Sequence, residues 1–423
     1  MTKQPLALAS AGAFVAALST SLVAVSVPVI ARELQVRPAD VSWVLSAYLL
    51  SVSCLLALAG KAADVLGRRR VYLAGFAVFA LGSAACAGAT TLAILVGARV
   101  VQGVGAAMLM AVGPAIVTRS APPERRARAL GVQLAATYLG LTLGPSLGGL
   151  LSAGIGWHAI FVVIAVAGAL GGALAWALLP ADERLDAGGG PGARSLGAAL
   201  DLGGATLFAA ALGALLLSLK RGPEVGWSSP RELAPVGLSV ALFVGFVRRA
   251  RAHPSPVLPL DLLRRSSFSL GVAGAALLYT VSFMLAYLLP FELQHGAGLS
   301  PARAGAFMTA QPATMAAVAP VSGVIADRWG PRAPSTIGML TIGAGLVAVA
   351  MTGSSPDVRL VLALAAVGAG AGLYVAPNSA LIMGSAPRER QGVASAMAAT
   401  ARNLGMTLGI AVAASLDQAL GFR

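Results

Sequence analysis

Charged residues are scarce in this chain. They make up 11% of its 423 residues, whereas soluble globular domains carry about 25%. Hydrophobic residues reach 57%, and because a membrane-spanning helix takes about 20 residues, that share is enough for about a dozen spans. The composition therefore excludes a soluble enzyme and a receptor with a single membrane anchor.

Cysteine and histidine are also nearly absent. The two cysteines, Cys54 and Cys86, lie inside apolar runs, and the three histidines are scattered along the chain. A disulfide framework is therefore excluded, and the histidines do not form a cluster of metal ligands. The sequence has no G-x-x-x-x-G-K-[ST] segment for binding a nucleotide. We therefore expect no metal, no cofactor and no use of ATP.

Thirteen apolar runs are separated by charged residues. Helix is the only open-chain structure that satisfies its own backbone in lipid, so each run predicts a spanning helix. The first run is longer than the hydrophobic region of a signal peptide, which takes about 7–15 residues. The eighth run is short and is the least secure span. The runs are 6–31, 41–60, 71–90, 92–118, 129–152, 157–179, 198–219, 233–247, 268–291, 302–326, 333–352, 358–384 and 393–416.

The basic residues indicate which loops face the cytoplasm, where Lys and Arg are retained. Of the 30 basic residues, 20 lie in the N-terminus and the alternate loops on its side, 8 lie in the opposite loops, and two, Arg99 and Arg402, lie inside apolar runs. This asymmetry predicts a cytoplasmic N-terminus in the plasma membrane. The formal charge of +14 then reflects topology and contact with anionic lipid, and we expect no nucleic-acid partner.

An internal repeat divides the chain. The segment GKAADVLGR, which begins at Gly60, matches GVIADRWG, which begins at Gly323, at an offset of 263 residues. SAPPER and LGLTLG reappear as SAPRER and LGMTLG at an offset of 265. Three matches in the same order predict two copies of a six-helix unit, an arrangement common in transporters. The predicted units are an N-terminal repeat over 1–190, an inserted helix pair with linkers over 191–266, and a C-terminal repeat over 267–423.

The second copy is one helix short. Adding 265 residues to the sixth run predicts a last helix at 422–444, whereas the sequence ends at Arg423. We therefore expect thirteen spans and a C-terminus outside the cell, with twelve or fourteen spans as the alternatives.

Several segments resemble motifs of the major facilitator superfamily. GKAADVLGRRR is similar to the loop between its helices 2 and 3, LVGARVVQGVGAAM to its fourth-helix motif, and GLTLGPSLGG to the fifth-helix motif of its antiporters. DLGGATLF and RGPEVGWSSP resemble the two extra helices of its fourteen-helix drug:proton antiporters. The resemblance implies an all-α polytopic membrane protein with the major facilitator fold, in which two six-helix repeats flank an inserted helix pair.

The loop motif and its second copy predict a cytoplasmic gate. Glycine permits the sharp turn, and the acid before it can pair with a cation when the two halves close. A simple positive anchor at the cytoplasmic face is the alternative. The predicted gate residues are Gly60, Asp64, Gly67, Arg68, Gly323, Asp327 and Gly330.

The fifth run predicts a smooth helix seam. Glycines that recur every four residues allow close helix contact, and a proline bends the same helix. Static packing is the alternative to a seam that governs which side opens. The seam residues are Gly140, Gly144, Pro145, Gly148 and Gly149.

Polar residues inside the apolar runs predict a polar path. Arg99 lies about 10 Å along its helix, where insertion of a charge costs roughly 2.5–3.5 kcal/mol unless the side chain reaches the outer interface. Gln102 follows one turn later on nearly the same face. The predicted path comprises Arg99, Gln102, Glu292, Arg402 and Asn403.

Aromatic and methionine side chains on the ninth and tenth runs predict an adaptable, largely apolar substrate pocket. Ordinary core packing is the alternative for each of them. The pocket residues are Tyr279, Phe283, Met284, Tyr287, Met308, Gln311 and Met315.

The first run departs from the branch that it resembles, in which an acid precedes a conserved proline. Ser19 stands in the place of that acid and Ala24 in the place of an Asn, so the usual proton carrier is absent. Glu292, at the outer end of the ninth run, is the best remaining acid. A solvated loop charge is the alternative interpretation of Glu292.

These observations predict a monomeric secondary transporter that exports hydrophobic or drug-like small molecules across the bacterial plasma membrane in exchange for protons. A dedicated exporter of a metabolite, sugar, amino acid or self-made antibiotic is the alternative within this class. A non-transporting sensor or an inactive remnant is the alternative outside it.

Overall fold

The computed structural model describes residues 3–120, 126–180, 201–226, 229–253, 256, 258, 260–352, 356–387 and 391–420. These residues form thirteen long helices. Ten of the helices are long and apolar enough to cross a membrane. The predicted all-α membrane fold is confirmed.

The first six long helices, which we call the N-half, correspond to the first six apolar runs. A single helical turn, α2 (Pro38–Val41), links the first two of them. The long helices are α1 (Lys3–Glu33), α3 (Trp43–Leu66), α4 (Arg68–Ala87), α5 (Leu92–Ser120), α6 (Arg126–Gly154) and α7 (His158–Leu178).

The last five long helices form the C-half. They are α11 (Ser266–Phe291), α12 (Pro301–Trp329), α13 (Arg332–Thr352), α14 (Val358–Ser385) and α15 (Gln391–Leu420). A 3₁₀ turn, η2 (Leu260–Arg264), precedes α11, and a π-helical turn, η3 (Glu292–Gly296), follows it.

Two further helices, α9 (Leu202–Val225) and α10 (Pro230–Ala252), lie between the halves in sequence. The uncertain eighth run is part of α10, which is 23 residues long. The helix is longer than the run because it continues through charged residues at both ends, such as Arg231 and Arg249, which a search for apolar runs leaves out.

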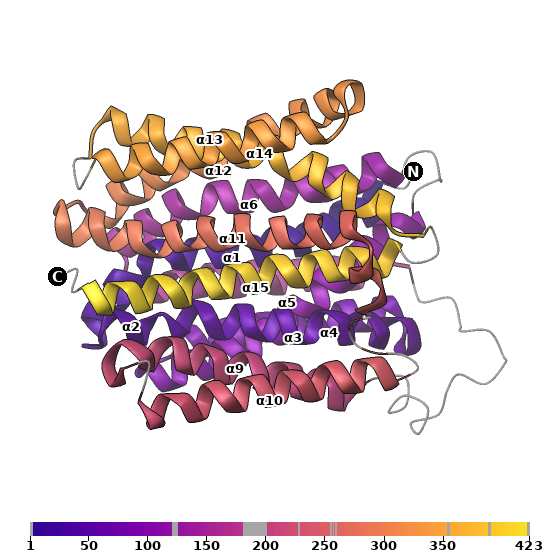
Figure 1. The fold of residues 1–423 in the computed structure, drawn as a ribbon, viewed down its shortest axis with the longest axis horizontal. Coiled ribbons are helices and arrows are strands. Elements are labelled where there is room, and N and C mark those ends of the chain that lie inside the picture. The colour runs from indigo at the N-terminus through magenta and orange to yellow at the C-terminus, as the bar shows by residue number, and fades with distance from the viewer. Residues whose placement is uncertain are drawn as a thin grey trace.

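The long helices lie side by side in one bundle, and the two chain termini lie at its opposite ends (Figure 1). We call these the N-terminal end and the C-terminal end of the bundle. Large apolar side chains cover the outside, as expected for a surface in lipid: Trp176 on α7 is 69% exposed and Leu340 on α13 is 70% exposed.

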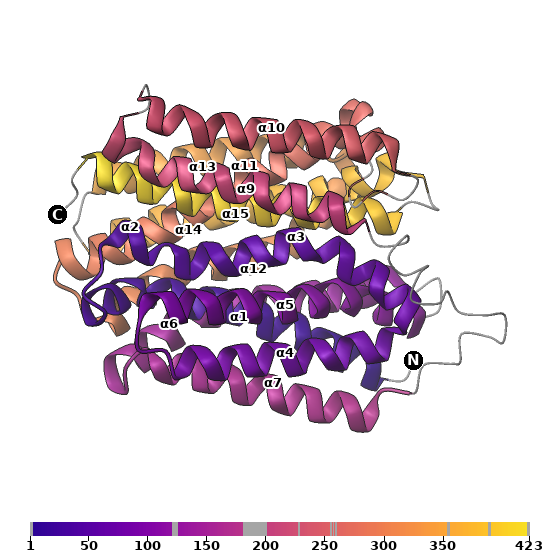
Figure 2. The ribbon, with the colours of Figure 1, turned by 90° about the horizontal axis from the view of Figure 1, so that it is seen from below.

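The two halves repeat the same helix pairing. In the N-half α1 packs against α6, and in the C-half α11 packs against α15. The halves meet where α6 contacts α12 and where α3 contacts α15. Helix α9 contacts both α3 and α15, so the inserted pair covers this second seam between the halves (Figure 2).

Candidate translocation cavity

A large cavity lies between the halves. Its volume is about 1830 Å³, and its wall includes Tyr48 and Tyr138 of the N-half and Tyr279 and Arg402 of the C-half. Several of its lining residues stand at the N-terminal end of the bundle, among them Lys61. The cavity therefore runs from the middle of the bundle to its N-terminal end.

A smaller apolar cavity of about 90 Å³ lies next to it. Tyr279 and Phe283 line both cavities. The small cavity also contains Met308, Gln311 and Met315 of α12. Five of the seven predicted pocket residues therefore lie together, at the junction of the two cavities.

The other two predicted pocket residues, Met284 and Tyr287, line neither cavity. With 3.6 residues per helical turn, positions 279 and 283 share one face of α11. Met284 is turned by about 100° from Phe283 around the helix, and Tyr287 lies two turns beyond Tyr279, toward the C-terminal end. Both pack against the buried core cluster of the N-half.

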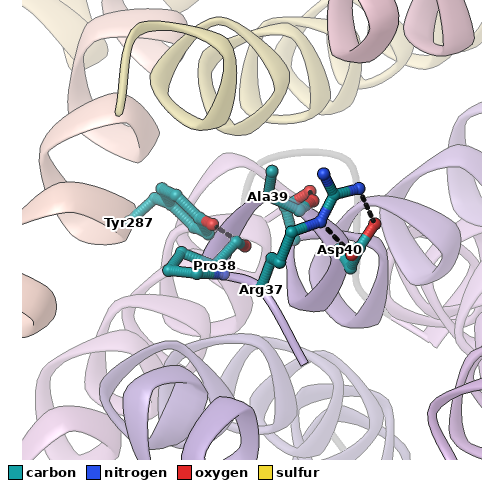
Figure 3. Close-up of polar contacts among 6 residues, drawn as sticks. Arg37, Pro38, Ala39, Asp40 and Tyr287 are labelled. Atoms are coloured by element: carbon teal, nitrogen blue, oxygen red, sulfur yellow. Dashed lines mark hydrogen bonds and ion pairs between the residues drawn. The ribbon is translucent and has the colours of Figure 1, made fainter. Parts of the chain in front are cut away.

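Tyr287 instead closes the C-terminal end. Its hydroxyl group donates a hydrogen bond to the carbonyl oxygen of Pro38 in α2, next to the Arg37–Asp40 ion pair (Figure 3). Gln294 Nε2 donates to the carbonyl oxygen of Val25 at 2.8 Å. Both bonds join one half of the protein to the other.

The glycine seam of α6 packs on both halves. A Cβ atom on Gly140 would lie 2.6 Å from the Phe14 carbonyl oxygen of α1, and one on Gly144 would overlap the Ser21 side chain. Gly148 likewise has no room for a Cβ because Leu22 of α1 lies against it.

The other side of the seam faces α12 of the C-half. A Cβ on Gly149 would overlap the Pro301 carbonyl oxygen, and one on Gly305 of α12 would overlap the Pro145 carbonyl oxygen. The hydroxyl oxygens of Ser146 and Thr309 are 2.7 Å apart at the same contact. The predicted seam residues therefore lie where α6 packs closely on α1 with one face and on α12 of the C-half with the other.

Arg99 is fully buried inside the N-half. Its Nε donates to the Val44 carbonyl oxygen at 2.8 Å, and its Nη1 donates to Gln102 Oε1 at 2.5 Å and to Ser19 Oγ at 3.2 Å. Its guanidinium carbon lies 4.2 Å from the ring centre of Tyr48, which separates it from the large cavity. Because the side chain is buried, it does not reach the outer interface.

Sequence reasoning missed part of this network. Gln102 Nε2 donates to Ser83 Oγ of α4 at 2.7 Å, and no motif pointed to Ser83 or Tyr48. Ser19 could be singled out from the sequence, because it stands at the position where the resembled branch carries an acid. Arg99 Nη2 has no hydrogen-bond partner among the described residues.

The predicted polar path falls into three separate places. The contacts of Arg99 all lie in the N-half, whereas Arg402 and Asn403 line the large cavity from α15. Glu292 begins the π-helical turn at the C-terminal end, where its charge acts on Asp417. In this structure these residues do not lie side by side, because Arg99 on α5 makes its hydrogen bonds inside its own half.

The predicted gate residues lie at the N-terminal end. Gly67 (φ 101°) and Gly330 (φ 78°) adopt left-handed backbone conformations at the ends of α3 and α12, as the repeated motif predicts. Gly60 and Arg68 line the mouth of the large cavity, and a Cβ on Gly323 would meet nothing within 4 Å. The side chains of Asp64 and Asp327 lie outside the described residues.

The inserted pair is anchored near this gate. Buried Asp201 accepts hydrogen bonds from Arg249 Nε at 2.6 Å and from the Gly204 backbone N–H at 2.9 Å. Burial alone would raise the pKa of Asp201, but these two bonds and the charge of Arg249 hold it below its ordinary value. Lys61 Nζ donates to the Pro256 carbonyl oxygen at 3.0 Å and so ties α3 to the segment after α10.

Comparison with known proteins identifies the family. The chain is 32% identical over 409 residues to the multidrug resistance protein Stp of Mycobacterium tuberculosis, covering 96% of this chain and 74% of that protein. It is 30% identical over 401 residues to the riboflavin transporter RibZ of Clostridioides difficile, covering 95% and 85%. It is 30% identical over 405 residues to the tetracenomycin C resistance and export protein of Streptomyces glaucescens, covering 95% and 73%.

Solved structures agree on the fold. A D-xylose–proton symporter superposes with a TM-score of 0.67 at 14% identity, over 97% of this chain and 89% of that one. A bacterial homologue of the lysosomal transporter Spinster, in an inward-facing conformation, has a TM-score of 0.66 at 16% identity, over 96% and 80%. The family model for the Major Facilitator Superfamily matches residues 9–410, and this chain therefore belongs to that superfamily and is a transporter rather than an enzyme.

Proposed function

We propose that the protein exports hydrophobic small molecules by alternating access. The observation that carries this proposal is the cavity between the halves, which reaches the N-terminal end and is blocked at the C-terminal end by cross-half contacts such as Tyr287 with Pro38. The small cavity beyond it has an apolar wall, with Met308 and Met315 as adaptable side chains. The relatives Stp and the tetracenomycin C export protein support export as the direction of transport.

The distribution of basic residues indicates the side of the membrane to which the cavity opens. The basic loops of the N-terminal end predict that this end faces the cytoplasm. The cavity then opens inward, which is the state in which an exporter takes up its substrate. The glycine seam of α6 packs closely on both α1 and α12. Such a contact lets the two halves close tightly at one end and separate there as rigid bodies when that end opens.

The proposal includes exchange for protons. Ser19 leaves Arg99 without a carboxylate among its partners, so the carrier lies elsewhere. We assign it to Glu292, an acid at the C-terminal end of the bundle whose charge acts on Asp417 of α15.

A flux assay tests this function. The purified protein is reconstituted in liposomes, and transport of a panel of hydrophobic compounds is measured with and without an imposed pH gradient. We expect accumulation that depends on the gradient and is lost in Gly144→Leu. A protein that moves no compound under either condition would support a sensor or an inactive remnant.

A dedicated exporter is a second candidate. The riboflavin transporter RibZ is 30% identical to this chain and covers 95% of it, so a narrow substrate range has support among the relatives. The same panel separates the two functions, since a dedicated exporter would transport one chemical class and leave the others behind.

A further inference from the structure

The wall of the large cavity is strongly positive. Among the described residues that line it, the only acid is Asp261, and the cations are Lys61, Arg68, Arg251, Arg264 and Arg402. Four of these cations stand near the N-terminal end, where basic residues also serve topology. They are therefore weak evidence about the substrate.

Arg402 is different because of its depth. It lies 11 residues after Gln391, where α15 begins, and so about 16 Å along the helix axis. This is near the middle of the bundle, where a charge is expensive and usually marks a functional site. Neither topology nor an anchor at the membrane surface accounts for a cation at this position.

Arg402 also lacks a partner. Within the described part of the chain it makes no hydrogen bond and no ion pair, in contrast to Arg99, which has three hydrogen bonds inside its own half. A charge inside a membrane protein normally pairs with an opposite charge or with backbone carbonyl groups. The guanidinium of Arg402 therefore lines the cavity, and no described group of the protein accepts a hydrogen bond from it.

The neighbours of Arg402 add an aromatic wall to the cavity. The charge of Arg402 acts on Tyr138 of α6, whose buried hydroxyl group lies beside Tyr279. Tyr138 packs in one cluster with Tyr279 and Phe283 of α11. The site thus offers a guanidinium group and aromatic faces, and among the described lining residues the only carboxylate is Asp261 near the mouth.

We propose that this cavity selects aromatic organic anions, such as carboxylates and sulfonates. This inference rests on the proposed export function and narrows its substrate class. Arg402 binds the acid group, for which the planar guanidinium offers two parallel donors. Tyr138, Tyr279 and Phe283 contact the aromatic body, and the cations at the mouth raise the local concentration of anions.

A binding assay on the full chain in nanodiscs tests the proposal. Binding of radiolabelled 2-naphthoate is compared with binding of 2-naphthamide, its neutral analogue of nearly the same shape. We expect 2-naphthoate to bind about 10- to 100-fold more tightly, as charge-assisted hydrogen bonds to one arginine allow. Arg402→Gln should remove this preference and leave the affinity for 2-naphthamide unchanged.

Arg332→Gln is the matched control. It removes the same charge from the N-terminal end of the bundle, where Arg332 is exposed and does not line the cavity, so the preference should persist. Arg402→Lys should keep part of the preference, because it retains the charge and loses the two-donor geometry. If Arg402→Gln does not fold, Arg402→Lys is used in its place to test the proposal.

Equal binding of the two compounds by the wild-type protein would overturn the proposal. So would an undiminished preference for 2-naphthoate in Arg402→Gln or in Arg402→Lys. Because binding is measured without transport, flux of neutral compounds in the liposome assay would still support export after such a result. Absence of flux for every compound would contradict export itself.

Discussion

Tyr287 of α11 donates a hydrogen bond to the backbone carbonyl of Pro38 in α2, and so a side chain of the C-half holds the backbone of the N-half (Figure 3). The bond lies at the C-terminal end of the bundle, beyond the point where the large cavity ends. An alternating-access cycle must break it whenever this end opens.

Tyr287→Phe should therefore shift the protein toward the state that is open at the C-terminal end. Loss of one hydrogen bond changes the free energy by about 0.5–1.5 kcal/mol, which corresponds to a change of about 2- to 10-fold in population. Spin labels at Glu33 and His295 report the separation of the two halves there. Tyr374→Phe is the control, because Tyr374 packs against Gly274 within the C-half; an unchanged distance distribution in Tyr287→Phe would contradict the prediction.

Gly144→Ala should destabilise the protein even though it adds a single methyl group. The new Cβ would overlap Ser21 of α1, and overpacking of this kind costs about 1–3 kcal/mol. Gly154→Ala, near the end of the same helix, meets nothing within 4 Å and should be neutral. Thermal unfolding in detergent compares the two variants, and equal melting temperatures would show that α1 and α6 are not in close contact.

Ser19→Asp should stabilise the protein at neutral pH. Ser19 Oγ lies 3.2 Å from Arg99 Nη1, so a carboxylate there would give the buried charge a partner. Ser26→Asp on the same helix is the control. Ser26 contacts Ser152 at 2.6 Å, and a carboxylate buried there without a cation should lower the melting temperature. A similar decrease in melting temperature in both variants would mean that Arg99 does not form an ion pair with an acid on α1.

Glu292→Gln should weaken the dependence of efflux on the pH gradient more than it weakens substrate binding. Glu33→Gln is the control, since Glu33 is an exposed acid at the same end of the bundle. Efflux is measured in liposomes over a series of imposed gradients. If Glu292→Gln retains the pH dependence of the wild-type protein, Glu292 is a solvated loop charge and another group carries the proton.

The helices and the glycine seam could be predicted from sequence because their signals are local. An apolar run predicts a span by itself, and glycines every four residues define one helix face wherever the partner helix lies. Placement of Tyr287 and Arg99 could not be predicted in the same way. Their contacts with Pro38 and Ser19 depend on which face of a helix meets which neighbour, and a single sequence does not contain that information.

The depth of Arg402 was visible in the sequence, but its lack of a partner was not. The same is true of Tyr138, which no motif singled out and which becomes notable only beside Arg402 and Tyr279. A cation that lines a cavity is recognised because no neighbouring side chain or backbone group pairs with it. Only the packed structure shows which groups are its neighbours.

Access to the cavity from the two sides of the membrane tests the central claim most directly. A single cysteine at Ala399, which lines the large cavity, is introduced after Cys54→Ala and Cys86→Ala. Without substrate, we predict rapid labelling by an impermeant thiol reagent from the cytoplasmic side and slow labelling from outside. During transport, labelling from outside should increase. Labelling that is equal from both sides, or that is never possible from outside during transport, would contradict a cavity that opens to each side in turn.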